Sequence, residues 1–382
     1  MVTWEQRKLG DIAKRVIRKN KENDILPVLT NSADLGIVLQ NDYFDKAIAK
    51  NLNNYYIVSH NDFVYNPRIS KKAPFGPINR NKLNIQGVMS PLYLVFRFNS
   101  EMDLNFLEYY FQSSKWHPFM YKNGDSGARA DRFAIKNSVL MNMTINVPTL
   151  DQQKRIGKIL LLLENSIALQ QRKLEQLELL QKSILQTIFT SNNKKEKIEL
   201  NKLANYRRGS FPQPYTNKKW YGGKNSKPFV QVIDVNDNLK LHEQTKERIS
   251  EIAQPKSVFV PKGSIIVTLQ GSIGRVAITQ YDSYVDRTLL ILTDFKKKID
   301  KYYFANALKM VFNKEKLKAP GGTIKTITKS TLSSFKIVLP NIKLQIQYGK
   351  LLKSVDKQII LNKNRIMKLK KIKQFLLQNI FI

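Results

Sequence analysis

Arginine, lysine, asparagine and glutamine side chains lie in or beside glycine-containing loops in both halves of this sequence. Arginine and lysine form hydrogen bonds with the edge of guanine, and asparagine and glutamine form them with the edge of adenine. Glycine lets a loop approach a nucleic-acid backbone closely. The candidates in the first half are Arg68, Lys71, Lys72, Lys122, Asn123, Arg129 and Arg132. Those in the second half are Gln270, Ser272, Arg275, Thr323 and Lys325. For any one of them a solvated surface role is the alternative, but we expect at least one contact from each loop.

A second type of contact is expected at the turn Tyr206-Arg207-Arg208-Gly209, whose two arginines are placed to meet phosphate groups. Phosphate contacts position a DNA-binding protein without selecting a sequence. The lysine-rich runs 194–197 and 296–298 are expected to be solvated linker and turn faces instead.

Sequence motifs of catalysis are missing. There is no phosphate-binding GxxxxGK[ST] loop, no GxGxxG at a strand end and no acidic-aromatic-proline motif of an amino methyltransferase. His60, His117 and His242 lie far apart, without a second ligand at metal-binding spacing. We therefore expect neither a catalytic nor a metal site. A standalone nuclease that binds metal at the D-x-K pattern of Asp294 and Lys296 is one alternative.

The composition is strongly basic. Sixty-four Lys and Arg residues against 30 Asp and Glu residues give a formal net charge of +34 over 382 residues. Such a field attracts nucleic acid or anionic membrane. A lysine-rich host composition is a contributing explanation, and a protein that binds RNA or membranes by charge alone is a second alternative.

The cellular setting follows from what the sequence lacks. It has no cysteine, which excludes disulfides, and its start has no apolar segment that could act as a signal peptide. The aliphatic run 159–163 is far shorter than a membrane span. We expect a soluble, cytoplasmic protein.

The ends of the two halves of the sequence are copies of each other. Residues 135–189 align with 327–381 at a constant shift of 192, without a gap. Equivalent pairs include Pro148 and Pro340, Gln153 and Gln345, and Gly157 and Gly349. The duplication predicts two related units.

Each half is expected to begin with a variable α+β region and to end in a long helix. Strands are predicted at 55–58, 62–65 and 89–98 with a helix at 104–113, and then at 230–233, 264–269, 275–279 and 288–292 with a helix at 301–311. The predicted boundaries are 1–150 for the first variable region, 151–192 for the first long helix, 193–341 for the second variable region and 342–382 for the second long helix.

Apolar residues recur in steps of three and four along both predicted long helices, which is coiled-coil spacing. We expect the two helices to pair antiparallel around a core of Ile156, Leu160, Leu163, Ile167, Leu174, Leu177, Leu352, Val355, Ile359, Ile366 and Leu369. Polar residues interrupt both rows, and the expected register sets Gln170 opposite Lys373 and Gln181 opposite Asn362. Acidic residues of the first helix, Glu164 among them, could pair with the basic second helix. A helix over 151–189 would be about 58 Å long at roughly 1.5 Å per residue, about the length of 17 base pairs.

The order and spacing of several segments resemble the DNA specificity subunit of type I restriction-modification systems. The similarity extends over the chain and includes the opening 4–12, the segments 148–156 and 340–345 that introduce the long helices, 260–267 with 271–274, and the glycine-threonine loop 321–327. The first half departs from it: residues 60–63 replace the glycine turn found at 262–265, and the loop 124–129 has no threonine.

The resemblance implies a non-catalytic subunit with two dissimilar target-recognition domains, separated by two conserved helices. The domains would read the two parts of an asymmetric double-stranded DNA target, and the helices would fix the gap. Two methyltransferase subunits would dock along the helices, with restriction (endonuclease and translocase) subunits added outside. The chain itself would need no cofactor, since S-adenosylmethionine, ATP and Mg would belong to the partners.

Overall fold

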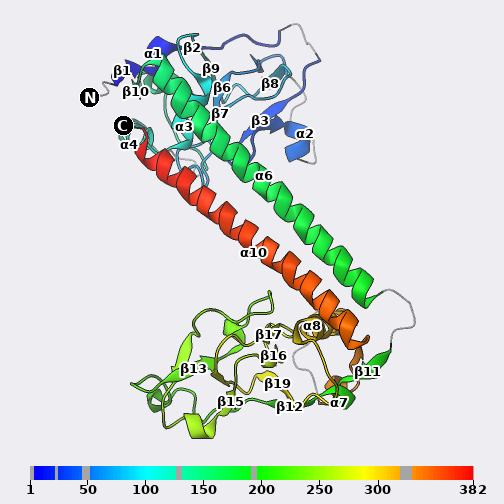
Figure 1. The fold of residues 1–382 in the computed structure, drawn as a ribbon. Helices are drawn as coiled ribbons and strands as arrows, with labels where there is room; N and C mark the ends of the chain where they lie inside the picture. The colour runs from blue at the N-terminus through cyan, green and yellow to red at the C-terminus, as the bar shows by residue number, and fades with distance from the viewer. Residues whose placement is uncertain are drawn as a thin grey trace. The chain divides into compact units, whose positions relative to one another are not determined.

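The computed structural model describes residues 4–21, 25–44, 52–125, 131–190, 196–318 and 329–381, with side chains left out at 316–318 and 329–330. The chain forms two compact units (Figure 1). Unit 1 comprises Met1–Gln171 with Asn364–Ile382, and unit 2 comprises Arg172–Lys363. Each unit thus contains one variable region and parts of both long helices.

Unit 1 is built on a four-stranded sheet in the order β2-β9-β6-β7, with two-stranded sheets β1-β10, β3-β4 and β5-β8 beside it. Its elements are β1 (Glu5–Lys8), α1 (Leu9–Ile12), β2 (Ala13–Arg15), β3 (Leu29–Ser32), β4 (Gly36–Leu39), α2 (Gln40–Tyr43), β5 (Tyr56–Val58), β6 (Phe63–Tyr65), β7 (Ile78–Arg80), β8 (Gly87–Met89), β9 (Leu94–Phe98), α3 (Leu104–Gln112), α4 (His117–Asn123), α5 (Asn137–Met141), β10 (Thr144–Val147) and the start of α6 (Leu150–Phe189). The rings of Phe63, Phe98 and Phe111 join the sheet to α3 in one core. Burial of these aromatic side chains is the main stabilisation of the unit.

Unit 2 has two four-stranded sheets, β12-β19-β16-β17 and β14-β13-β18-β15, and the small sheet β11-β20. Its elements are β11 (Lys197–Glu199), α7 (Leu200–Leu203), β12 (Asn205–Arg208), β13 (Lys227–Val230), β14 (Glu247–Ile249), β15 (Val258–Val260), β16 (Ile265–Thr268), β17 (Val276–Ile278), β18 (Ser283–Val285), β19 (Leu289–Thr293), α8 (Lys301–Lys318), α9 (Lys329–Ser333), β20 (Lys336–Val338) and α10 (Ile342–Asn379), with short 3-10 turns at Lys218–Trp220, Val232–Asp234 and Gln254–Lys256. All pairings are antiparallel except β13 with β18. The predicted α+β class is confirmed.

Two predicted strands differ from the structure for local reasons. The stretch 89–98 is divided between β8 and β9, because a turn at Ser90, where Tyr93 N donates to the Ser90 carbonyl, contains Pro91. The predicted strand 230–233 ends at Val230, because the Asp234 carboxylate accepts the Gln231 N–H at 2.7 Å and closes a 3-10 turn. The predicted helix 301–311 continues to Lys318.

The repeated proline and glutamine attach each long helix to its variable region. Gln153 donates to the Pro148 carbonyl at 3.0 Å and accepts the Asp103 N–H at 3.0 Å. Asp103 in turn caps α3 by accepting the Phe106 N–H at 2.8 Å. The same bonds recur in unit 2. Gln345 donates to the Pro340 carbonyl and accepts the Asp300 N–H, and Asp300 accepts the Tyr303 N–H at the start of α8. Side chains that satisfy two helix starts at once explain why these positions match in the two halves.

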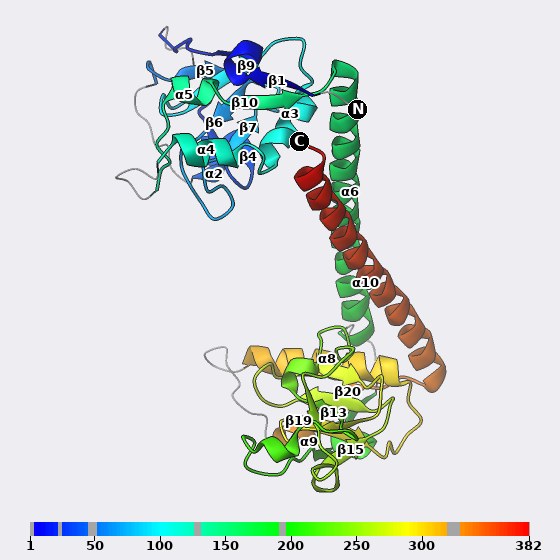
Figure 2. The same cartoon turned by 90° about the vertical axis from the view of Figure 1, so that its left-hand side faces the viewer.

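The two long helices pack antiparallel within each unit (Figures 1 and 2). In unit 1, Lys373 of α10 donates to Glu164 of α6 at 3.1 Å, and the end of α10 places Phe381 against Phe106 of α3. In unit 2, Lys363 of α10 pairs with Glu178 of α6 at 2.7 Å. The predicted antiparallel pairing is confirmed.

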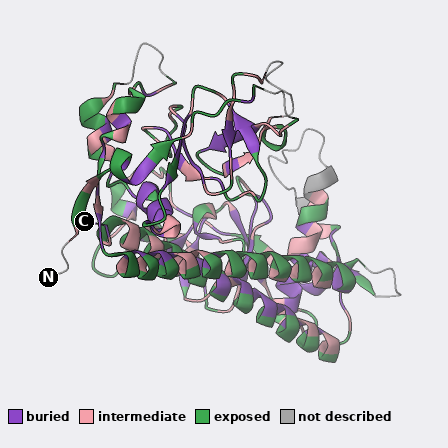
Figure 3. Cartoon of the chain, turned by 90° about the horizontal axis from the view of Figure 1, so that it is seen from above, coloured by how far each residue is buried: buried purple, intermediate pink, exposed green. Residues whose placement is uncertain are grey.

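The predicted coiled-coil core positions face inward in both units. Leu160, Ile167 and Ile366 are buried in unit 1, as are Leu352, Val355 and Ile359 in unit 2. Ile156, Leu163, Leu174, Leu177 and Leu369 are half-buried. The outward positions of both helices are exposed (Figure 3).

The predicted register is wrong. Lys373 bonds Glu164, which lies six residues before the expected partner Gln170, and Gln181 donates to Asp356, six residues before the expected Asn362. Carboxylates satisfy a buried ammonium or amide better than a second amide does, so the acids determine the alignment.

Candidate nucleic-acid interface

In unit 1, three segments bring several of the predicted residues together into a candidate interface. The end of α4 carries Lys122 and Asn123, and the bridge between Arg68 and Arg132 joins segments 66–69 and 131–134. Backbone bonds from Phe133 N to the Pro67 carbonyl, at 2.8 Å, and from Asp125 N to the Ala134 carbonyl, at 3.0 Å, hold the segments in place.

Lys122, Asn123 and Arg132 border one open cavity of about 950 Å³. Its floor is apolar, with Phe133 buried and Ile135 half-buried. Cationic donors around an apolar floor suit an extended polyanion that carries flat, stackable groups.

Arg68, Lys71 and Lys72 do not line this cavity. Arg68 contacts Asp131 at 3.5 Å, and Lys71 is exposed. Lys72 is paired with Asp34 at 2.5 Å. Arg129 lies outside the described residues.

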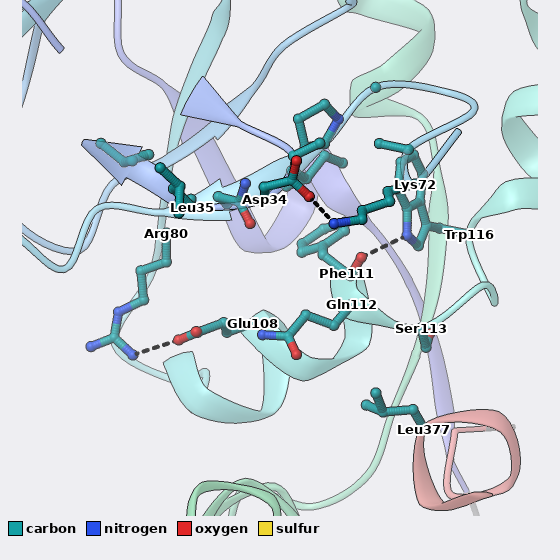
Figure 4. A pocket seen from close by; sticks show the side chains of 18 of the residues that line it. Asp34, Leu35, Lys72, Arg80, Glu108, Phe111, Gln112, Ser113, Trp116 and Leu377 are labelled. Carbon is teal, nitrogen blue, oxygen red and sulfur yellow. Dashed lines mark hydrogen bonds and ion pairs between the residues drawn. The ribbon is translucent and has the colours of Figure 1, made fainter. Parts of the chain in front are cut away.

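A second cavity, of about 570 Å³, lies beside α3 in unit 1 (Figure 4). Its charges are already balanced: Glu108 contacts Lys82 at 2.5 Å and Arg80 at 3.7 Å, and Asp34 holds Lys72. His117 also lines it, and burial lowers the pKa of its imidazole. Because its cations are matched by carboxylates, this cavity is less suited to a polyanion.

The candidate interface of unit 2 consists of the segments 208–210, 269–271 and 286–288. Gly209 N donates to the Leu289 carbonyl at 3.1 Å, and Leu269 N donates to the Thr288 carbonyl at 2.8 Å. A Cβ at Gly209 would clash with the carbonyls of Val285 and Asp286, so only glycine fits there. The predicted Arg208 and Gln270 are therefore attached to the same turn, 286–288.

The remaining predicted residues of unit 2 differ in their surroundings. Arg207 is exposed on β12, and its Nε–H donates to the Arg208 carbonyl at 3.5 Å. Ser272 is exposed. Arg275 is held by Asp237 at 3.0 Å and by the Val235 carbonyl at 3.3 Å, which occupies its donors away from this turn. Thr323 and Lys325 lie outside the described residues.

Arg287 is a candidate that the sequence patterns did not reveal. It is exposed at the centre of the turn between β18 and β19, with its guanidinium carbon 5.3 Å from the Tyr215 ring centroid. The turn has no glycine, and its contact with Tyr215 spans 72 residues of sequence. No local signal pointed to it.

The structure gives no support to the nuclease alternative. The Lys296 ammonium donates a hydrogen bond to the Asn201 carbonyl at 2.8 Å, and the Asp294 carboxylate accepts one from the Asn205 amide at 3.4 Å. Among the described residues, no group of three or more His, Cys, Asp or Glu side chains could hold a metal ion. Within the same residues, no helix combines the length and the apolar character needed to cross a membrane.

The fold and the two interfaces define a duplicated α+β protein in which each variable region is followed by a long helix. The family model for the type I restriction modification DNA specificity domain matches twice, at residues 1–179 and 192–371. The chain therefore belongs to this family.

Known relatives agree with this assignment. A protein of Methanocaldococcus jannaschii described as a specificity subunit of the type I restriction enzyme MjaX is 23% identical over 258 residues, which span 63% of this chain and 59% of the relative. The solved S subunit of a type I restriction-modification system from M. genitalium has a TM-score of 0.63 at 14% identity and matches 100% of this chain and 96% of its own. The HsdS subunit of Thermoanaerobacter tengcongensis has a TM-score of 0.52 at 18% identity, over 98% and 95% of the two chains. At these identities the structural matches establish the fold.

Proposed function

We propose that this chain is the DNA specificity subunit of a type I restriction-modification complex. Each unit would read one half of an asymmetric, bipartite double-stranded DNA target. Partner subunits would methylate and cleave the DNA with S-adenosylmethionine, ATP and Mg, so that this chain would need no cofactor. The complex would act on DNA in the cytoplasm. The observation that carries the proposal is the double match to a DNA specificity domain in one chain.

The two half-sites should differ, because the two interfaces differ chemically. Unit 1 offers Lys122, Asn123 and Arg132 around an open cavity. Unit 2 offers Gln270 beside one tight turn, with Arg208 next to it for a phosphate contact. Different donors at different spacings select different base edges.

Further contacts are proposed from the sequence pattern alone, namely Lys71, Arg129, Ser272, Thr323 and Lys325. Lys72 and Arg275 would first have to leave their carboxylate partners, so we assign them a smaller role. The recognition domains would be 1–150 and 193–341, with 151–192 and 342–382 as spacer helices.

The long helices carry a duplicated exposed surface that fits two copies of one partner. Unit 1 exposes Ile159 and Leu169 of α6, and unit 2 exposes the equivalent Leu351 and Leu361 of α10, each between 45% and 63%. Residues ten apart lie about 15 Å apart along a helix and about 80° apart around it, so both can belong to one broad face. Exposed aliphatic rows on an otherwise polar helix are typical of helix-packing surfaces. We assign this surface to two methyltransferase subunits, with restriction subunits outside them.

Leu169→Asp and Leu361→Asp test this surface. Each single variant should lose one of the two methyltransferase subunits and the double variant both, because a buried carboxylate without a partner disfavours packing. Native mass spectrometry of the purified complex would count the subunits. Gln171→Asp, at an exposed site on the same helix, is the control, and full occupancy in the double variant would contradict the assignment.

The target itself is tested by methylation sequencing of cells that express this chain with its partners. We expect one asymmetric motif with a fixed gap, and filter binding should favour that duplex over random DNA. Equal binding to all nucleic acids, without a methylated motif, would rule the proposal out in favour of binding by charge alone.

A further inference from the structure

The turn that joins β18 to β19 is rigid and is fixed by a buried carboxylate. Asp286 is 3% exposed and accepts hydrogen bonds from Thr288 N, at 2.9 Å, from the Thr288 hydroxyl and from the Tyr215 hydroxyl. Its own N–H donates to the Val230 carbonyl at 3.0 Å. Hydrogen bonds to a buried carboxylate are strong, so the residues on both sides of Arg287 are held in place.

The aromatic ring below Arg287 is part of the core. Tyr215 packs on Phe211 with ring centroids 4.9 Å apart, and Phe211 stacks on the fully buried Phe229 at 4.5 Å. Burial and the Asp286 carboxylate raise the pKa of the Tyr215 hydroxyl, which keeps its proton and its bond to Asp286. The Arg287 guanidinium therefore lies over a ring that is packed on this aromatic core and hydrogen-bonded to Asp286.

The donors of Arg287 are unused. The side chain is exposed, and no described residue accepts a hydrogen bond from it or forms an ion pair with it. Arg248, also exposed in unit 2, differs because its guanidinium donates to Ser226. A planar group with free donors, already ordered by an aromatic ring, loses little conformational entropy when it binds.

We propose that Arg287 determines specificity by recognising a guanine in the half-site that unit 2 reads. Arginine bonds O6 and N7 of guanine in a bidentate manner, which requires a fixed guanidinium plane. Arg208 and Gln270, on the loops attached to the same turn, flank Arg287 for contacts to the backbone or an adjacent base. This inference rests on the proposed function and identifies one reader in it.

The test uses Arg287→Ala and Arg287→Lys in the full chain, assembled with its partners. We expect both variants to lose discrimination at one base pair of one half-site by roughly 5- to 150-fold, the range of one bidentate contact. The lysine variant retains the charge, so its binding to random duplex should stay close to that of the wild type. The other half-site and the gap should be unchanged. Arg248→Ala is the matched control and should leave the motif intact.

Two outcomes would overturn the inference while leaving the proposed function in place. One is a wild-type motif that both variants reproduce unchanged. The other is an equal loss of affinity for every sequence in Arg287→Ala, which marks a phosphate contact. A wild-type complex without any bipartite motif would instead refute the proposed function itself. Thermal unfolding of each variant separates loss of folding from loss of reading.

Discussion

At the scale of single residues, a few side chains connect the long helices to the recognition regions. Gly157 lies where α6 crosses the start of α3, and an added Cβ would lie 2.6 Å from Asp103 Oδ1. Gly349 meets Asp300 in the same way in unit 2. Both aspartates cap the helices that follow them, so a side chain at either glycine would push a capping residue away.

Gly157→Ala should therefore destabilise unit 1, by about 1 to 3 kcal/mol, through overpacking and the lost cap. In an exposed helix the same substitution stabilises by about 1 kcal/mol, so the sign of the change is diagnostic. Urea unfolding measures it, and Ser166→Ala at an exposed position of α6 is the control. A Gly157→Ala variant more stable than the wild type would contradict the crowding.

Arg132 and Arg208 should differ in what their removal changes. Arg132→Ala should alter base preference in the half-site of unit 1 alone, because Arg132 lies with Asn123 at the edge of the cavity. Arg208→Ala should weaken binding to all sequences alike and reduce the salt slope by about 1, as expected for a phosphate contact. Binding titrations at several salt concentrations, on specific and random duplex, separate the two.

At the scale of elements, the same polar cluster joins a recognition helix to both long helices in each unit. In unit 1, the Glu164 carboxylate of α6 accepts hydrogen bonds from the Tyr109 hydroxyl of α3, at 2.6 Å, and from the Lys373 ammonium of α10, at 3.1 Å. In unit 2, Asp356 accepts hydrogen bonds from the Tyr302 hydroxyl and the Gln181 amide. Asp356 and Gln181 are the repeat equivalents of Glu164 and Lys373, whereas the tyrosine comes about one turn earlier in its helix than Tyr109 does. Burial raises the pKa of both tyrosine hydroxyls and the carboxylates raise it further. The phenols therefore remain donors.

Glu164→Gln should make the stability of unit 1 less dependent on acid pH. Burial alone would raise the pKa of Glu164, but the bonds from Tyr109 and Lys373 outweigh it and hold the pKa below its ordinary 4.5. The carboxylate therefore stabilises the folded state fully above pH 4.5, and this contribution is lost as the pH falls through the lower, folded-state value. The variant should lose about 1 kcal/mol at pH 7, a modest figure because the side chain is 39% exposed.

Urea unfolding at pH 7 and at pH 3.5 measures this difference. The gap between wild type and Glu164→Gln should narrow at the lower pH. Asp151→Asn, which removes an exposed carboxylate of the same helix paired with Arg155, is the control and should shift little. A gap that is constant with pH would show that the charge of Glu164 does not matter.

At the scale of the whole molecule, the duplication joins two different variable regions through helices of matched length. α6 spans 40 residues and α10 spans 38. If these helices set the gap in the target, lengthening both should lengthen the gap. The reading loops would be unaffected, because they lie in the recognition regions.

Insertion of one heptad after Gln170 and another after Asn362, at repeat-equivalent positions, should add about 10 Å at roughly 1.5 Å per residue. The gap should then grow by about 3 base pairs with both half-sites unchanged. Methylation sequencing reports the half-sites and the gap together. An insertion in one helix alone should misalign the apolar seam and abolish specific binding, and an unchanged gap in the double insertion would show that the helices do not set it.

The duplication, the α+β class, the long helices and their antiparallel pairing can be predicted from the sequence, because repeats and the periodicity of apolar residues can be read along the chain. The sequence patterns also predict Lys122, Asn123 and Arg208 as binding residues, which lie at the ends of α4 and β12. The predicted helix register is wrong, because it sets polar core residues opposite one another. In the structure Lys373 and Gln181 bond the carboxylates of Glu164 and Asp356, which occupy equivalent positions in the two copies.

Which cationic side chains remain free to bind an anionic partner depends on the tertiary structure. Lys72 and Arg275 match Arg287 in charge, but folding places carboxylates beside the first two and an aromatic ring beside the third. Ion pairing and stacking depend on contacts between residues far apart in the chain, such as Tyr215 with Arg287. Composition gives the total charge, while the fold alone determines where that charge is left unneutralised.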